Sequence, residues 1–138
     1  MRTNLTLNDI GRLLDEPLVA VLATLRSDGS VLLSPVWHEW RDGGFNLWLP
    51  ADDVKTRHLR RDPRASIVVA ESADPLRGVE LRTEVRLLDA GDLAGAIRIA
   101  TRYVGPEKGD EYVREAGYDS VIGRLEPGHL RIWDFADE

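Results

Sequence analysis

Apolar and polar positions recur with different periods along the chain, and each period predicts a different kind of element. Residues 6–15 place apolar side chains at helical spacing, which predicts a short amphipathic helix. Runs rich in valine and leucine then predict buried strands, and the Asp-Gly pairs between them predict tight turns. The predicted strands cover residues 17–26, 31–40, 45–50 and 66–70, and the predicted turns cover residues 27–30 and 41–44.

The second half of the chain contains the cleanest alternation, over residues 79–87. One face of this segment carries Val79, Leu81, Thr83, Val85 and Leu87, and the other face carries only charged residues. Such a strand keeps one face in water, which is typical of an antiparallel sheet. Helical spacing predicts helices over 92–105 and 109–117, and residues 120–135 predict a hairpin around Pro127-Gly128.

The order of these elements predicts the fold class. Six or seven strands without regular alternation of strand and helix exclude a doubly wound sheet. We therefore expect a mainly β (α+β) protein, an antiparallel barrel with short helices on its outside. No internal repeat, linker or low-complexity tract interrupts the pattern, so we expect residues 1–138 to form a single domain.

Composition narrows the class of protein further. Of the 138 residues, 43% are hydrophobic and 30% are charged, which is typical of a folded globular chain rather than a disordered one. The absence of cysteine excludes disulfides and thiol catalysis, and it favours a reducing compartment. The first residues do not resemble a signal peptide, and no run of about 18 apolar residues occurs. We expect a cytoplasmic protein that does not associate with a membrane.

Positive charge is concentrated in residues 55–64, KTRHLRRDPR. Five basic residues and one aspartate give this stretch +4, whereas the chain carries −6, so the other 128 residues carry −10. A helix is predicted over 53–61, with Asp52 and Asp53 as capping residues. Two interpretations fit this helix: it forms ion pairs with acidic neighbours, or it binds an anion such as phosphate. The acidity of the whole chain argues against nucleic acid as a partner.

The motifs of common catalytic sites are absent. The sequence contains no G-x-G-x-x-G, P-loop, G-x-S-x-G or H-E-x-x-H pattern. The three histidines, His38, His58 and His129, lie on separate predicted elements, so we expect no metal site. No side chain stands out as an obligate acid or base, and the catalytic residues are unknown.

Tryptophan and proline residues near the basic stretch favour the anion site. Pro35 predicts a bulge, a sheet edge or an interruption that leaves backbone groups available to a ligand. Trp37 offers a flat apolar wall. Together with Trp48 and Trp133, and with the cationic cluster close by, it predicts a flat, phosphorylated aromatic ligand.

Three quoted segments together carry a family resemblance: AVLATLRSDGSVLLSPVWHEW, the RDGG turn with FNLWLP, and KTRHLRRDPRASIVV. They resemble the pyridoxamine-phosphate-oxidase-like split-barrel family of flavin and deazaflavin oxidoreductases. The resemblance is greatest to the branch that uses the deazaflavin coenzyme F-420, and DPLRGVELRTEVRLL and HLRIWDF extend it over nearly the whole chain. It implies a six-stranded split β-barrel, a homodimer, and two equivalent cofactor sites at the dimer interface. It also implies hydride transfer to or from a small unsaturated substrate, with the redox chemistry supplied by the cofactor.

The resemblance assigns the phosphate-binding side chains. Lys55 and Arg57 would hold the cofactor phosphate, with His58 beside them. The family commonly has a small hydroxyl residue at the end of the third strand, where this chain has Pro50 and Ala51, so one phosphate hydrogen bond is lost. His58 stands where the family often has asparagine, and it would donate more strongly when protonated, so binding would weaken above about pH 6.5.

The resemblance also assigns the residues around the cofactor ring. The ring would be lined by Ser34, Pro35, Val36 and Trp37. Arg77 and Trp133 match positions that reach the site of the neighbouring subunit.

Other functions stay open beside this one. The same scaffold would also suit FMN, because both cofactors place a phosphate and a tricyclic ring similarly. A protein that binds a flavin-like or haem-like molecule without turnover is a further possibility, and so is a nucleic-acid binder that acts through residues 55–64.

Overall fold

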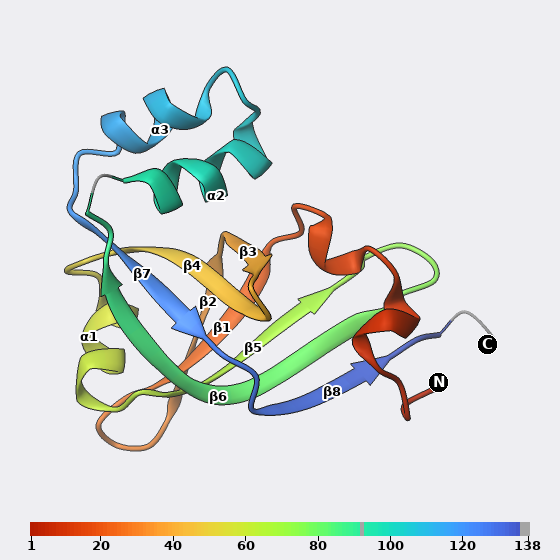
Figure 1. Ribbon diagram of the computed structural model, residues 1–138. Helices are drawn as coiled ribbons and strands as arrows, with labels where there is room; N and C mark the ends of the chain where they lie inside the picture. The colour runs from red at the N-terminus through yellow and green to blue at the C-terminus, as the bar shows by residue number, and fades with distance from the viewer. Residues whose placement is uncertain (92, 136–138) are drawn as a thin grey trace.

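A computed structural model of the chain describes residues 1–91 and 93–135 (Figure 1). Its strands are β1 (Ala20–Leu25), β2 (Val31–Val36), β3 (His38–Arg41), β4 (Gly44–Pro50), β5 (Arg64–Ala70), β6 (Gly78–Asp89), β7 (Ser120–Leu125) and β8 (His129–Trp133). Its α-helices are α1 (Val54–Arg61), α2 (Ala94–Val104) and α3 (Gly109–Glu115), and two 3-10 helices, η1 (Leu7–Ile10) and η2 (Leu13–Asp15), precede β1. No helix in these ranges is long and apolar enough to cross a membrane.

The strands form one curled antiparallel sheet in the order β2-β1-β5-β6-β7-β4-β3, and β8 also pairs with β6. Strands β2 and β3 belong to one run of chain that is interrupted only at Trp37, yet β2 pairs with β1 and β3 pairs with β4. The chain at Trp37 therefore joins the two ends of the sheet, and the Trp48 backbone N–H donates to the Trp37 carbonyl at 3.4 Å. The predicted mainly β split barrel is confirmed.

The interior of the barrel is apolar, because alternate side chains of each strand point into it. Leu22 of β1, Ile67 of β5 and Leu81 of β6 are almost completely buried. The predicted alternation of residues 79–87 is confirmed in β6, where Val79 and Val85 are also buried and the intervening charged side chains face outward. Burial of such side chains is the main source of stability for a sheet of this size.

The predicted hairpin over residues 120–135 is wrong. Strands β7 and β8 do not pair with each other; they pair one after the other with the two halves of β6, at Val85–Asp89 and at Gly78–Arg82. Pro127 interrupts the ladder because it has no N–H. A Cβ at Gly128 would lie 2.5 Å from the carbonyl oxygen of Arg82, so glycine permits the close passage beside β6. The Pro-Gly pair marks an interruption in one long run rather than a turn.

Three other expectations are corrected by the structure. The predicted helix over 6–15 is the pair of 3-10 helices η1 and η2, separated at Gly11, whose φ is +61°. The predicted strand over 31–40 is broken at Trp37 into β2 and β3. The predicted helix over 92–105 begins at Ala94, and Asp92 lies outside the described residues.

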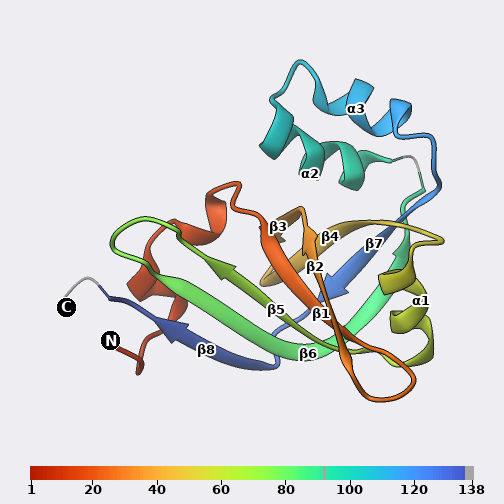
Figure 2. The ribbon, with the colours of Figure 1, turned by 180° about the vertical axis from the view of Figure 1, so that it is seen from behind.

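Helices α2 and α3 pack together on the outside of the barrel, against β4 and β7 (Figures 1 and 2). Gly109 allows their close approach, since a Cβ there would overlap Thr101 Oγ1 and lie 2.9 Å from Thr101 Cα. A second apolar cluster joins Ile99 of α2 and Val113 of α3 to Trp48 of β4. Strand β4 is therefore covered on both faces, by the barrel interior and by the α2–α3 pair.

Candidate functional site

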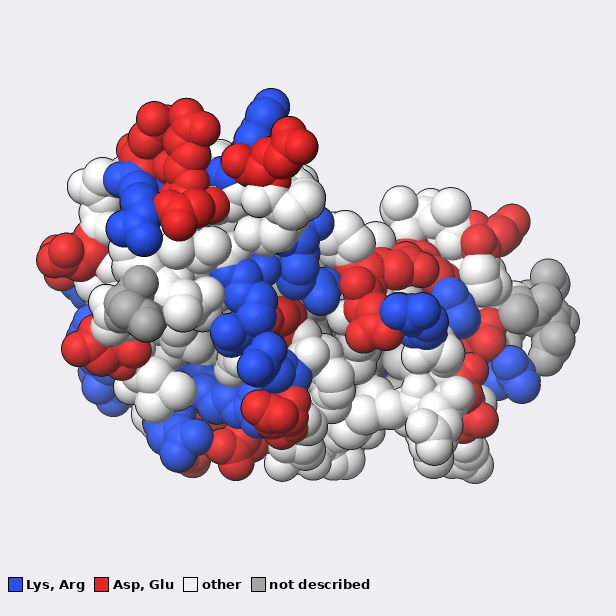
Figure 3. Space-filling view, turned by 45° about the horizontal axis from the view of Figure 1, so that its top comes forward, with Lys and Arg blue, Asp and Glu red and all other residues white. Residues whose placement is uncertain are grey.

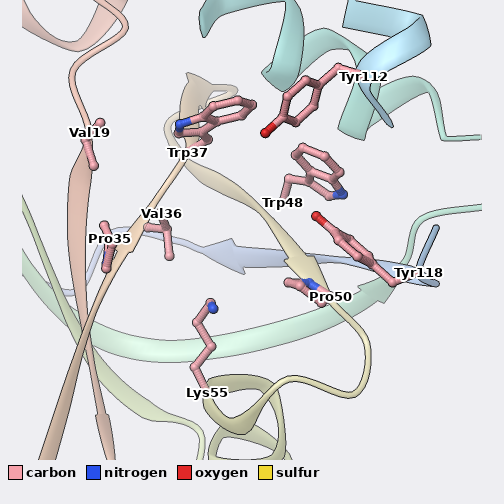
Figure 4. Close-up of a pocket in the computed structure, with 9 residues that line it drawn as sticks. All are labelled: Val19, Pro35, Val36, Trp37, Trp48, Pro50, Lys55, Tyr112 and Tyr118. Carbon is pink, nitrogen blue, oxygen red and sulfur yellow. The ribbon is translucent and has the colours of Figure 1, made fainter. Parts of the chain in front are cut away.

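A cavity of about 360 Å³ lies at the corner where the chain turns from β2 into β3 (Figure 4). It lies between the barrel, the first turn of α1 and the α2–α3 pair. Its lining consists of Val19, Pro35, Val36, Trp37, Trp48, Pro50, Lys55, Tyr112 and Tyr118.

The break in the strand places Trp37 in the cavity. On either side of it, Val36 and His38 are buried, whereas the Trp37 ring stands outside the barrel interior. Tyr103 of α2 stacks on the Trp37 ring at a centroid distance of 4.7 Å and an interplanar angle of 5°. The Tyr103 hydroxyl donates to the Leu18 carbonyl at 2.9 Å and accepts from the His38 backbone N–H at 3.1 Å. The Trp37 ring is thus supported by a tyrosine that α2 carries and whose hydroxyl is held by hydrogen bonds to Leu18 and His38.

Further aromatic rings form one wall of the cavity. Trp48 donates its indole N–H to Ser120 Oγ at 2.8 Å, which fixes the plane of its ring. Tyr112 of α3 lies 5.1 Å from Trp37 and 5.9 Å from Trp48, and Tyr118 lies 5.8 Å from Trp48, between ring centroids. These distances are typical of packed aromatic pairs, so the wall is built by mutual contact of the rings.

The placement of the α2–α3 pair depends on an ion pair with β3 whose carboxylate is buried. Arg98 of α2 donates from Nε and Nη2 to the two carboxylate oxygens of Glu39, each at 2.7 Å, and Asn46 donates to the same carboxylate at 2.9 Å. Burial opposes ionisation of Glu39, but these hydrogen bonds outweigh it and lower the pKa of Glu39. The carboxylate therefore stays charged and holds α2 against the barrel.

Lys55 is the cation of the cavity, and it already has a partner. Its ammonium forms an ion pair with Asp53, the residue that precedes α1. The hydrogen bond from Lys55 lowers the pKa of Asp53. Thr56 donates to the Pro50 carbonyl at 2.7 Å, so the first turn of α1 is fixed against the end of β4. An anion that binds Lys55 must therefore compete with the Asp53 carboxylate.

The remaining cations of residues 55–64 differ in their partners. Arg64 pairs with Asp62 at 2.8 Å. Arg60 and Arg61 donate to the backbone carbonyls of Ala51 and Leu25. Within residues 1–91 and 93–135, the exposed Arg57 side chain has no hydrogen bond or ion pair. Basic and acidic groups are interspersed on the face shown in Figure 3. Of the lysine and arginine side chains of α1, Lys55 is paired with a carboxylate, whereas Arg60 and Arg61 contact backbone carbonyls.

The predicted site residues divide into two groups. The five that line the cavity are Pro35, Val36, Trp37, Pro50 and Lys55. The six that the structure places outside its lining are Ser34, Ala51, Arg57, His58, Arg77 and Trp133. Ser34 is buried on the inner face of β2, and Ala51 and Arg57 lie close by in sequence to the lining residues Pro50 and Lys55.

The structure does not bring His58 into the cavity. Its ring is buried against the barrel, and its Nδ1 lies 3.0 Å from Thr24 Oγ1 of β1. Burial lowers the pKa of His58, and the nearby charges of Arg61, Arg26 and Arg57 lower it further. A neutral imidazole that is bonded to β1 fits an anchor for α1 better than a donor to phosphate.

Arg77 and Trp133 lie together at the far end of β6. Arg77 forms an ion pair with Glu71 at 2.5 Å and donates to the Ile10 carbonyl at 2.9 Å. The Trp133 ring covers Gly78, where a Cβ would overlap the indole. Their expected contribution to the site of a neighbouring subunit stays a prediction.

Sequence reasoning missed Val19, Tyr112 and Tyr118 as lining residues, and it used Trp48 to infer the kind of ligand without naming it as a site residue. Neither tyrosine belongs to a motif, and the nearest signal was the predicted helix over 109–117. Among the described residues no group of three His, Cys, Asp or Glu side chains is arranged to hold a metal ion.

The strand order and the closure at Trp37 define a split-barrel protein. Residues 8–133 match the family model described as Pyridoxamine 5'-phosphate oxidase, and the chain belongs to this family. No curated protein matches the chain in sequence.

Solved structures share this fold. The conserved hypothetical protein Rv2991 from Mycobacterium tuberculosis matches with a TM-score of 0.80 and 26% identity, over 95% of this chain and 86% of that chain. An F-420 reductase matches with a TM-score of 0.70 and 25% identity, over 86% of this chain and 92% of that chain. A heme binding protein from Mycobacterium smegmatis matches with a TM-score of 0.67 and 25% identity, over 88% of this chain and 51% of that chain. Proteins with this fold thus include both a reductase and a heme-binding protein.

Proposed function

We propose that the protein binds the deazaflavin coenzyme F-420 and is an oxidoreductase for a small unsaturated substrate. The observation that carries the proposal is that one cavity combines aromatic rings with a lysine. Trp37 and Trp48 supply flat apolar surface, and the ammonium of Lys55 faces the same space from α1 (Figure 4). A ligand that has both a planar ring and a phosphate matches the two features together. The match to an F-420 reductase at 25% identity supports this choice of ring.

The side chains of the cavity fit such a cofactor. Pro35, Val36 and Trp37 would lie along the ring, and Lys55 would hold the phosphate. Arg57 is exposed and has no partner among the described residues, so its guanidinium is free to turn toward the same anion. When bound, the deazaflavin supplies hydride chemistry, and the residues of the chain hold it, orient it and exclude water from it.

FMN is the second candidate for the same site, because it also joins a tricyclic ring to a phosphate. A haem-like ligand is a third, since one neighbour is named as a heme binding protein. None of the described residues that line the cavity is a histidine, so a haem there would lack the commonest protein ligand of its iron. The cavity therefore favours the two phosphorylated tricyclic cofactors.

We also propose that a second copy of the chain covers the outer face of β1 and β2. On this face Val21, Val31 and Leu33 are 37%, 48% and 65% exposed, and Val19 beside them is 53% exposed. A contiguous apolar surface of this kind is typical of an interface. Val19 and Pro35 border both this face and the cavity, so a second copy would also shelter the ring of a bound cofactor.

Titration of the purified protein with F-420 and with FMN tests the proposal. Binding quenches the fluorescence of Trp37 and Trp48 if the ring lies against them, and we expect tighter binding of F-420. Turnover of a quinone or an enone by the protein with reduced F-420 would support an enzyme rather than a carrier. Failure of both cofactors to bind would overturn the proposed function.

A further inference from the structure

Two phenol groups face the cavity without a hydrogen-bond partner. Figure 4 shows the hydroxyls of Tyr112 and Tyr118 directed into the space between Trp37, Trp48 and Lys55. Among the described residues, neither hydroxyl has a hydrogen bond. The two side chains are 46% and 44% exposed, so a ligand in the cavity can reach them.

The rings of the two tyrosines are positioned even though their hydroxyls are free. Tyr112 packs between Trp37 and Trp48, at 5.1 Å and 5.9 Å between centroids, and Tyr118 packs on Trp48 at 5.8 Å. Trp48 is in turn fixed by its hydrogen bond to Ser120. Two donors are therefore held at one side of the cavity by aromatic contacts that do not use their polar ends.

The polarity of the lining indicates which group these donors suit. Val19, Pro35, Val36 and Pro50 offer only apolar side chains, and the Trp48 N–H is already used. Burial raises the pKa of Tyr118, and Tyr112 and Asp53 raise it further, so this phenol remains protonated and acts as a donor at neutral pH. A planar ring that carries an acceptor oxygen satisfies both the apolar wall and the two donors.

We propose that Tyr112 and Tyr118 donate hydrogen bonds to a carbonyl oxygen of a planar, conjugated ring bound against Trp37 and Trp48. This inference rests on the proposed function, in that it takes the cavity to be a site for ring ligands. The carbonyl belongs either to a quinone or enone substrate or to the dione edge of the cofactor ring, and the two sources share this chemistry. In both cases the phenols select ligands by an acceptor that lies away from the phosphate.

The test compares two ligands that differ only in their carbonyl groups. The probes are 2-methyl-1,4-naphthoquinone and 2-methylnaphthalene, measured by equilibrium dialysis against the full chain without cofactor. The variants are Tyr112→Phe, Tyr118→Phe and the double variant, which keep the rings and remove only the hydroxyls. We expect each single variant to weaken quinone binding about 3- to 10-fold, the effect of one lost hydrogen bond, and to leave naphthalene binding unchanged.

Equal weakening of both ligands would assign the tyrosines a packing role and overturn the inference, and so would unchanged quinone binding. Repeating the titration with saturating F-420 identifies the source of the carbonyl. If the quinone still binds, the phenols contact the carbonyl of the substrate. If F-420 displaces the quinone, the phenols contact the carbonyl of the cofactor ring. The phosphate-binding role of Lys55 is unaffected by these variants, so failure of this inference is distinguishable from failure of the proposed function.

Discussion

Asp53 competes with any anion for Lys55, so its removal is predicted to strengthen cofactor binding. The two side chains form an ion pair and are only 36% and 16% exposed. Because the hydrogen bond from Lys55 lowers the pKa of Asp53, the carboxylate stays charged at every pH at which the protein is assayed. Asp53→Asn removes this charge and keeps a good N-cap residue, so α1 is expected to remain folded.

The size of the effect follows from the charges involved. A carboxylate about 5 Å from the singly charged phosphodiester of F-420 repels it by roughly 1 kcal/mol in a water-like dielectric. We therefore expect Asp53→Asn to tighten F-420 binding about 5-fold at low ionic strength, and by less at high salt because of screening. Fluorescence titration of the Trp37 and Trp48 signal at two salt concentrations measures both quantities.

A matched control separates this local effect from net charge. Asp52→Asn makes the same change one residue earlier, on an exposed side chain that forms no ion pair with Lys55 in the described structure, and we expect a smaller gain. Equal gains from the two variants, or unchanged binding in Asp53→Asn, would refute the view that Lys55 is the anion ligand.

Three further predictions concern stability and assembly. Burial lowers the pKa of His38 to about 4 from an ordinary value of 6.5, so the free energy of unfolding is expected to fall as pH decreases from about 6.5 toward 4. Urea unfolding should show a loss of roughly 2 kcal/mol between pH 7 and pH 5, and His38→Leu should remove it; an unchanged pH dependence in this variant would exclude His38 as the cause. Gly109→Ala should destabilise the protein by about 1 to 3 kcal/mol because the new methyl overlaps Thr101. Gly95→Ala is the control: its new methyl would lie 3.5 Å from the nearest atom, so this variant should be neutral or stabilising. Equal thermal midpoints for Gly109→Ala and Gly95→Ala would contradict this account. Leu33→Arg should convert a dimer to a monomer in light scattering, whereas an unchanged mass would place the interface elsewhere.

Local sequence signals predicted most of the barrel strands. The alternation over 79–87 identified β6 and its buried face, because a strand with one wet face needs a period of two. The turn at 41–44 followed from Asp42-Gly43, whose φ angles of 52° and 75° are those of a tight hairpin turn. The helix over 53–61 was also close to the observed α1.

The errors lie where distant contacts override local signals. Nothing near Pro127 indicates that β7 and β8 both pair with β6, because the pairing depends on contacts with a strand that is distant in the sequence. The break at Trp37 also has no local signal, because an apolar residue at that position fits a continuous strand. The break arises because β2 pairs with β1 whereas β3 pairs with β4.

The candidate site was predictable only for residues on the segments that carry the family resemblance. Pro35, Trp37 and Lys55 lie on segments whose order in the barrel the family resemblance implied. Tyr112 and Tyr118 reach the cavity because the ion pair of Arg98 with the buried Glu39 carboxylate holds α2 on the barrel. That pair joins residues 59 positions apart, and no local sequence pattern predicts it.

The central claim is that the cavity binds a ring ligand through its phosphate at Lys55, and one comparison tests it most directly. F-420 and its phosphate-free ring precursor are titrated against the wild-type protein, Lys55→Ala and Lys108→Ala, which changes the only other lysine. We predict that the wild type and Lys108→Ala bind F-420 at least about 10-fold more tightly than the precursor, the worth of a charged hydrogen bond, and that Lys55→Ala loses most of this preference. An undiminished preference for F-420 in Lys55→Ala would contradict the account.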